Sequence, residues 1–298
     1  MMFSKIYHTQ LGPYGVFGQN AVLPSPFLNF RTGPHPRRHR LGLLSMLTPA
    51  NKSTALSSSN EAIKEKIVDY WTERTSSFSD LRCKEFFSEK KDLWLVEIAK
   101  HLPSEKPLNI LDMGTGTGFF CFLLGQLGHN TTGIDLTESM IDKARELSKQ
   151  LQIQADFHVM DAESPDFADG RFDVLISRNL TWTLPNLEKA YNNWHRLLKP
   201  GGLLINFDAD YQHQQPDSQL PANHSHATMS KELVAKHKHI MRELSAAQVY
   251  KRPAWDKELL EKAGFKNIEI DPSPWERIYA IKDELYNPVP IFCITAQA

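Results

Sequence analysis

A glycine-rich turn between an apolar strand and a helix is the part of this sequence with the clearest chemical meaning. The apolar segment 110–112 ends in a carboxylate, and glycines follow at positions 114, 116 and 118. A dinucleotide-binding turn of the G-x-G-x-x-G type would carry its third glycine at position 119, where this chain has Phe119. Glycines in such a turn let the backbone approach a bound ligand closely. The turn therefore predicts a nucleotide-like ligand that has no pyrophosphate.

A second carboxylate stands where ribose recognition needs one. Asp135 ends the apolar segment 131–135, twenty-three residues after Asp112. In a βαβ unit, an acidic residue at about this spacing accepts hydrogen bonds from the hydroxyl groups of a ribose. The two motifs together predict an adenosine compound as the ligand and disfavour NAD.

These motifs resemble motif I and the following acidic strand end of the class I S-adenosylmethionine-dependent methyltransferases. Segments 160–163, 172–177 and 196–202 resemble later motifs of the same family, in the same order and at similar spacing. The resemblance covers about residues 61–298 and is closest to the small-molecule branch that contains quinone-biosynthesis enzymes. It implies methyl transfer from S-adenosylmethionine, by in-line displacement, to an acceptor that the motifs do not identify.

The resemblance also implies which residues contact the cofactor. Asp112 is expected to fix the glycine turn or to meet the cofactor's ammonium group, and Asp135 to hold the ribose. Asp161 is expected to accept a hydrogen bond from the adenine amino group. An aromatic ring near the sulfonium gains about 0.5 to 2 kcal/mol of cation–π attraction, a role we expect for Tyr70, whereas Trp71 reads as a core residue. The remaining expected cofactor contacts are Gly114, Thr115, Gly116, Gly118, Leu136, Met140, Ala162 and Ser177.

Polar residues that follow the fourth and fifth expected strands are candidates for the acceptor site. Arg178 can hold an anionic acceptor, and Asn179 can frame it. Asp210, His213, His224 or His226 can act as general base, since histidine titrates near neutral pH. Ordinary exposed loop histidines are the commonest alternative, and a Zn or Ni site is a weaker one. We expect no metal.

Charge and composition indicate which kinds of molecule the protein binds. The formal net charge is −1, but residues 1–60 hold six Lys and Arg and no acidic residue, which leaves −7 on residues 61–298. An acidic domain is a poor match for nucleic acid, which needs clustered Lys and Arg. No apolar run approaches the ~20 residues that span a bilayer. We therefore expect a cytoplasmic protein with a small-molecule acceptor and neither a nucleic-acid nor a membrane partner.

The chain divides into two parts by composition. Residues 1–60 are rich in Pro, Gly, Ser and Asn and lack sustained helical periodicity. A disordered extension is the favoured interpretation, with an organelle transit peptide or basic arm as the alternative. Residues 61–298 then form the methyltransferase domain.

Alternating strand and helix patterns predict a Rossmann-like α/β fold for the second part. We expect a seven-stranded, mostly parallel sheet with helices on both faces, and the resemblance implies that its last strand is antiparallel. The expected strands are 109–113, 130–135, 155–160, 172–177, 202–208, 267–271 and 290–296, and the expected helices are 61–75, 85–101, 118–127, 138–151, 187–198, 231–247 and 256–263.

An insert of about residues 209–252 follows the fifth strand and is far longer than the usual connection of ~2–6 residues. Ligands of this fold class bind at the carboxyl ends of the strands, where the insert emerges. It is therefore expected to be a helical lid over the acceptor. Two other functions stay open: a protein or RNA methyltransferase, and a non-catalytic regulator that binds S-adenosylmethionine.

Overall fold

The computed structural model describes residues 49–104, 107–224, 229–247 and 250–298. The chain divides into two units, 1–48 and 49–298. Most of the N-terminal extension predicted over residues 1–60 therefore lies outside the described residues. All that follows concerns the second unit.

Two helices precede the sheet. Helix α2 runs from Pro49 to Phe86 and α3 from Lys90 to Ala99. The first was predicted only over 61–75, although neither Gly nor Pro occurs between residues 51 and 86 to end it earlier. Helix α2 is therefore longer than the apolar pattern indicated.

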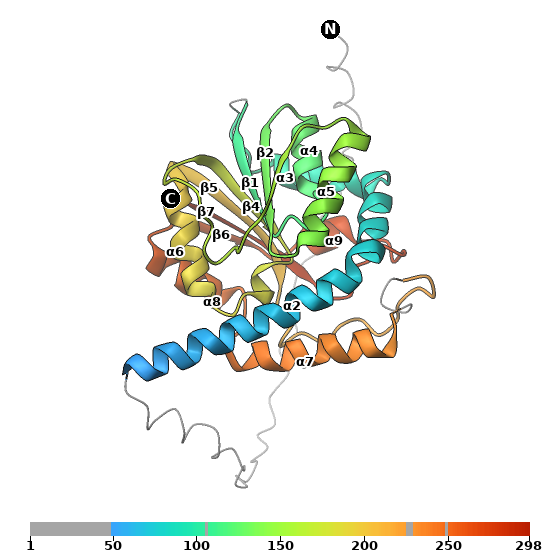
Figure 1. Cartoon of the computed structure of the whole chain (residues 1–298). Coiled ribbons are helices and arrows are strands. Elements are labelled where there is room, and N and C mark those ends of the chain that lie inside the picture. The colour runs from blue at the N-terminus through green and yellow to red at the C-terminus, as the bar shows by residue number, and fades with distance from the viewer. Residues whose placement is uncertain (1–48, 105–106, 225–228, 248–249) are drawn as a thin grey trace, which may run out of the picture. The chain divides into compact units, whose positions relative to one another are not determined.

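The sheet has seven strands in the order β3-β2-β1-β4-β5-β7-β6 (Figure 1). Strands β1 to β5 pair in parallel, whereas β7 is antiparallel to both of its neighbours, β5 and β6. The predicted fold class, including the antiparallel last strand, is confirmed. The strand bounds are β1 Asn109–Met113, β2 Asn130–Asp135, β3 Asp156–Val159, β4 Phe172–Arg178, β5 Leu198–Ala209, β6 Lys266–Asp271 and β7 Ile291–Gln297.

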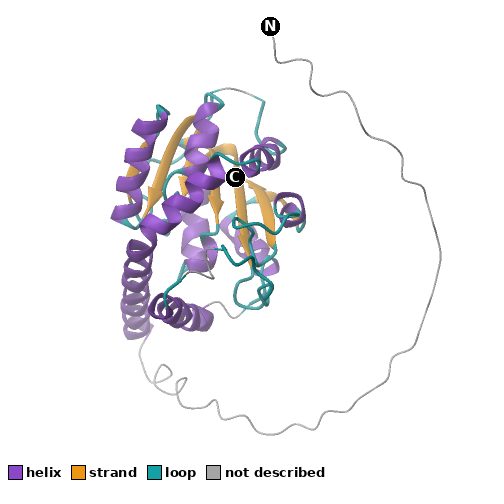
Figure 2. Cartoon of the chain, turned by 90° about the vertical axis from the view of Figure 1, so that its right-hand side faces the viewer, coloured by secondary structure: helices purple, strands orange, loops and turns teal. Residues whose placement is uncertain are grey.

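Helices cover both faces of the sheet, as Figure 2 shows. Successive side chains of a strand point to opposite faces, so Val174 and Ile176 of β4 join one core cluster and Leu175 joins the other. Residues of α3, α4 and α5 pack in the first cluster, and residues of α6 and α8 in the second. The helix bounds are α4 Phe119–Gln126, α5 Glu138–Leu151, α6 Leu187–Leu197 and α8 Ala254–Ala263.

The insert after β5 contains the predicted helix, α7, from Lys231 to Ala247. It packs beside α2 (Figure 1), and a separate apolar cluster lies between them. That cluster is built from Ile63, Tyr70, Trp182, Ile240 and Leu244. A short helix, α9 (Pro274–Ile278), was not predicted. No helix in the described part of the chain has the length and apolar character needed to cross a membrane.

Candidate functional site

The glycine turn has a backbone geometry that only glycine adopts without strain. Gly114, Gly116 and Gly118 all have positive φ, at 67°, 54° and 92°, a conformation that residues with a Cβ atom rarely adopt. The turn is tied to the neighbouring strand, because the Thr115 amide donates to the Ile134 carbonyl at 2.8 Å and the Gly116 amide to the Asp135 carboxylate at 3.0 Å. The end of β1 and the end of β2 thus form one rigid corner.

Two carboxylates frame this corner. Asp112 is buried and accepts a 2.7 Å hydrogen bond from the Thr115 hydroxyl, and burial raises its pKa to about 7. Asp135 is partly buried, and burial also raises its pKa, although amide hydrogen bonds from Thr137 and Gly116 oppose the shift. Each Asp135 oxygen accepts one of these amide bonds and has a second lone pair for a ligand hydroxyl.

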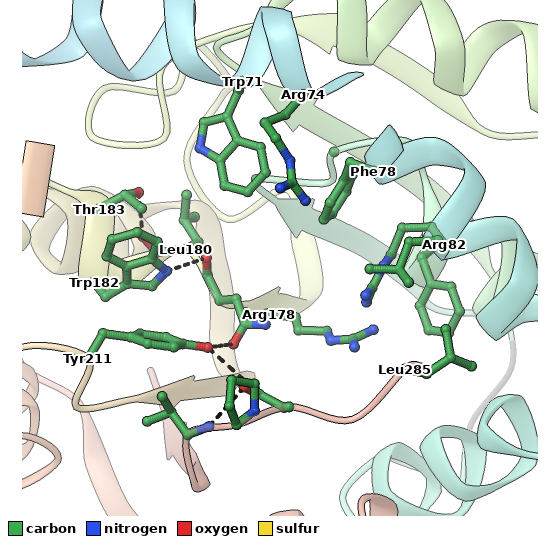
Figure 3. Close-up of a pocket in the computed structure, with 18 of the residues that line it drawn as sticks. Trp71, Arg74, Phe78, Arg82, Arg178, Leu180, Trp182, Thr183, Tyr211 and Leu285 are labelled. Atoms are coloured by element: carbon green, nitrogen blue, oxygen red, sulfur yellow. Dashed lines mark hydrogen bonds between the residues drawn. The ribbon is translucent and has the colours of Figure 1, made fainter. Parts of the chain in front are cut away.

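A cavity of about 460 Å³ opens over the turn (Figure 3). Its walls come from α2, the ends of β1, β2 and β4, the insert, and the segment 279–289 before β7. The lining combines aromatic and apolar side chains with a few charged ones, which is typical of a small-molecule site. The turn and its carboxylates are part of this cavity's lining.

Seven of the twelve predicted cofactor contacts line the cavity: Tyr70, Asp112, Gly114, Thr115, Gly116, Asp135 and Met140. These residues suit an adenosine-type cofactor, because Asp135 offers acceptors to a ribose and glycines 114 and 116 expose the backbone. Trp71 packs against the apolar cluster of Ile63, Tyr70 and Leu244, as expected of a core residue, and it also lines the cavity.

The other five predicted contacts are absent from the lining formed by the described residues: Gly118, Leu136, Asp161, Ala162 and Ser177. Packing explains Gly118, since a Cβ atom there would lie 2.7 Å from the Phe122 ring. Ser177 is buried and donates to the Asn206 side chain at 2.7 Å. Ala162 is buried within the core cluster that contains Leu175 and Trp194. For Leu136, which is partly exposed, no contact explains its position.

Asp161, the predicted adenine contact, forms an ion pair with a lysine of α2. The Lys64 ammonium lies 2.7 Å from Asp161 and 2.8 Å from Glu163. Burial opposes the charge of Lys64, but its hydrogen bonds to both carboxylates outweigh this effect and raise its pKa. The contact joins α2 to the turn after β3, and no pattern in the sequence pointed to it.

Three of the predicted acceptor-site residues line the cavity. Arg178, Asn179 and His224 line the cavity, whereas Asp210 lies outside the lining that the described residues form, and His226 lies outside the described residues. Asn179 adopts a positive φ of 54° and accepts a 3.0 Å hydrogen bond from the Tyr211 hydroxyl. That bond leads from the end of β4 to the insert.

The candidate bases are engaged in structural contacts. Buried Asp210 accepts from the Arg252 amide at 3.3 Å and lies 2.8 Å from the His213 ring. His224 Nε2 lies 2.7 Å from the Tyr286 carbonyl oxygen, so this nitrogen carries the proton and donates it. Within the described ranges, no three His, Cys, Asp or Glu side chains group as metal ligands.

Sequence reasoning missed most of the wall that α2 provides. Arg74, Phe78 and Arg82 line the cavity, and with Tyr70 they recur every fourth residue along the helix. Residues at this spacing share one helical face. That periodicity was the available signal, but it is equally typical of a helix packed on a core.

The fold and the site together define a class of protein. The structure has the features expected of class I methyltransferases. These are a sheet with an antiparallel seventh strand, a G-x-G-x-G turn after β1 and a carboxylate at the end of β2. Residues 111–206 match the family profile described as a methyltransferase domain. The chain contains a class I S-adenosylmethionine-dependent methyltransferase domain, and this prediction is confirmed.

Comparison with known proteins agrees with that assignment. The chain is 32% identical over 100 residues to a ubiquinone biosynthesis O-methyltransferase of Coxiella burnetii, which covers 34% of this chain and 43% of that protein. It is 34% identical over 142 residues to a highly reducing polyketide synthase of Neocamarosporium betae, which covers 44% of this chain and 5% of that protein. The chain therefore spans less than half the length of either relative.

A solved structure has the same fold. The S-adenosylmethionine-dependent methyltransferase from Mesorhizobium loti superposes with a TM-score of 0.51 at 17% identity, covering 69% of this chain and 98% of that one. At this identity the likeness concerns the fold alone.

Proposed function

We propose that this protein is an enzyme that transfers a methyl group from S-adenosylmethionine to a small-molecule acceptor by in-line displacement. One observation carries the proposal. A single cavity of about 460 Å³ joins the glycine turn and its two carboxylates to a wall of aromatic and cationic side chains. Both reactants can therefore lie in one enclosed space, as direct transfer requires.

The residues at the glycine turn would hold the cofactor. Asp135 accepts hydrogen bonds from the ribose hydroxyls, Asp112 faces the ammonium group, and Tyr70 contributes an aromatic ring from α2. The cofactor supplies a methyl group on a sulfonium, which is reactive enough to need alignment more than acid catalysis. The protein's contribution is to position the acceptor and to exclude water.

Helices α2 and α7 and the segment before β7 would exclude water. The insert lines the cavity through Tyr211, Gln214, Pro216 and His224, and α7 through His237 and Met241. This lining supports the predicted lid role. Replacing residues 212–224 with a short Gly-Ser link should abolish methyl transfer while S-adenosylhomocysteine still binds.

A small acceptor is favoured over a protein or an RNA. The volume falls within the ~300–1,000 Å³ of ordinary ligand pockets. Residues 61–298 carry −7, which opposes the approach of a nucleic acid. A regulator without catalysis would not need the cofactor turn and an acceptor wall to share one space.

A labelling experiment tests the proposal. The protein is incubated with S-adenosylmethionine labelled in its methyl group and with a fractionated small-molecule extract. We expect label in one class of small molecule, and much less label at subsaturating S-adenosylmethionine with an Asp135→Ala variant. Binding of S-adenosylmethionine without transfer to any fraction would favour the regulator, and label in protein or RNA would favour a macromolecular acceptor.

A further inference from the structure

The wall of the cavity formed by α2 and the end of β4 holds more positive charge than its carboxylates neutralise. Arg74, Arg82 and Arg178 all line it (Figure 3), and Glu85 is the carboxylate that the described residues place among them. Glu284 also lines the cavity, but Lys84 pairs with it at 2.7 Å. Glu85 pairs with Arg82 and Arg178 but not with Arg74, so this wall has three guanidinium groups and one carboxylate, an excess of two positive charges.

The protein holds Arg178 through both of its terminal nitrogens, although its Nε atom is buried with no partner among the described residues. Its two terminal nitrogens donate to Glu85 at 3.0 and 2.8 Å, and one of them donates to the Tyr279 hydroxyl at 2.8 Å. The guanidinium also lies over the Trp94 ring, 4.1 Å from its centroid. Burial opposes its charge, but Glu85 and Tyr279 outweigh this and raise its pKa. The residue that the sequence suggested for an anionic acceptor is thus held by the protein.

Arg82 pairs with Glu85, a carboxylate that also pairs with Arg178. Its Nη1 atom lies 2.6 Å from Glu85, which Arg178 already grips with two bonds. Its Nε atom is buried with no partner among the residues that the structure describes. Burial lowers the pKa of Arg82, and although Glu85 opposes the shift, the charge of Arg178 adds to it. An anion beside Arg82 would relieve this excess of positive charge.

Arg74 has no carboxylate partner among the described residues. Its side chain is 5% exposed and points into the cavity between Trp71 and Phe78 (Figure 3). Across the described ranges it makes no side-chain hydrogen bond or ion pair, and its Nε atom is buried without a partner. Isolated buried charges are strongly unfavourable, so such a group is typical of an anion-binding site.

The positions of the two arginines along α2 assign them to different ligands. Next to Arg74, the Thr75 hydroxyl lies 2.7 Å from that of Ser139 at the start of α5, directly after the ribose carboxylate Asp135. Arg82 lies two turns further along α2, beside Glu85 and the end of β4. Arg74 is therefore at the cofactor end and Arg82 at the acceptor end.

We propose that the acceptor is a small molecule with a carboxylate group, which Arg82 binds, attached to an apolar body that lies against Leu81 and Leu285. This inference rests on the proposed function, because the cofactor's own carboxylate neutralises only one of the two excess charges, at Arg74. An acceptor carboxylate neutralises the second. Guanidinium groups suit this role because they bind carboxylates through two parallel hydrogen bonds.

Binding measurements on matched variants test this assignment. Calorimetry gives the affinity of wild type, Arg82→Gln and Arg74→Gln for S-adenosylhomocysteine and for methylthioadenosine, which lacks the amino-acid carboxylate. A second titration, at saturating S-adenosylhomocysteine, compares benzoate with the uncharged benzamide. Circular dichroism checks the fold, and Arg82→Lys, which keeps the charge, serves where Arg82→Gln fails to fold.

The expected results separate the two arginines. Arg82→Gln should keep its S-adenosylhomocysteine affinity within about twofold and lose a preference for benzoate over benzamide of about tenfold or more. Arg74→Gln should lose S-adenosylhomocysteine affinity but not methylthioadenosine affinity. Equal binding of acid and amide by the wild type, or no binding of benzoate at millimolar concentration, overturns the inference. So does an Arg82→Gln variant that loses S-adenosylhomocysteine instead. Failure of the wild type to bind S-adenosylhomocysteine overturns the proposed function itself.

Discussion

Replacing Glu85 by glutamine should destabilise the protein strongly, although no atom of the main core is lost. Glu85 is fully buried and accepts from Arg178, Arg82 and the Trp94 indole, at 2.6 to 3.0 Å. Glutamine keeps the shape but removes the charge that compensates two buried guanidinium groups. Removing one partner of a buried ion pair costs about 3 to 5 kcal/mol, and we expect about 3 because the amide oxygen still accepts one bond.

Urea unfolding followed by tryptophan fluorescence measures this loss, and its pH dependence tests the cause. Burial alone would raise the pKa of Glu85, but Arg178 and Arg82 hold it below its usual value. The stabilisation is therefore present above the unfolded pKa of about 4.3 and is lost as the pH falls through the lower folded pKa. The difference between wild type and Glu85→Gln should be largest near neutral pH and should shrink in acid.

A surface carboxylate provides the control. Glu146 pairs with Lys143 at 2.9 Å on the exposed side of α5, and Glu146→Gln should leave the free energy of unfolding unchanged within error. A loss below about 1 kcal/mol for Glu85→Gln, or one that does not depend on pH, would refute the view that Glu85 compensates the two arginines.

Three further results are expected. Asp135→Ala should weaken S-adenosylhomocysteine binding by about 1.5 to 3 kcal/mol, the value of hydrogen bonds to a charged group, and calorimetry showing unchanged affinity would remove Asp135 from the site. Because of Asp112, the free energy of unfolding of the wild type should decline as the pH rises from about 4, the unfolded pKa, to the folded pKa of about 7, since the native state keeps a proton that the unfolded chain releases. Urea unfolding of Asp112→Asn should lack this decline. A pH profile of the variant identical to that of the wild type would contradict the raised pKa. A chain that begins at Ser59 should keep its melting temperature and cofactor affinity, because Ile63 is the first residue of α2 in the apolar cluster beside α7. A large drop in melting temperature would show that residues before Ser59 stabilise the domain.

The sheet could be predicted because its signals are local. Strands β1 and β4 contain short apolar runs, with Gly114 directly after the first strand and Asn179 directly after the second, and β2 ends at Asp135. Helix ends were less certain. Helix α2 continues to Phe86 because tertiary contacts support its second half, whereas the apolar pattern that suggested a helix stops at residue 75.

The cofactor end could be predicted for the same reason, and the acceptor end could not. Asp112, the glycines and Asp135 are placed by two consecutive strands, so their spacing along the sequence carries their geometry. Arg74 and Arg82 reach the cavity from a helix that precedes the sheet, and only the packing of α2 brings them there. Asp161 is a case in which the local motif was recognised but its partner was not, because Lys64, which pairs with it, lies about a hundred residues earlier in the sequence.

Helix α2 lines the cavity from Tyr70 to Arg82, a span of twelve residues or about 18 Å of a single rod. In the proposed function this one helix would contact both reactants, and a tilt of the helix would change both ends of the cavity at once. The two occupancies are then thermodynamically linked. Whatever factor the second reactant adds to the affinity of the first, the first adds the same factor to the second. The position of α2 would then set both the affinity for the spent cofactor and the affinity for the next acceptor.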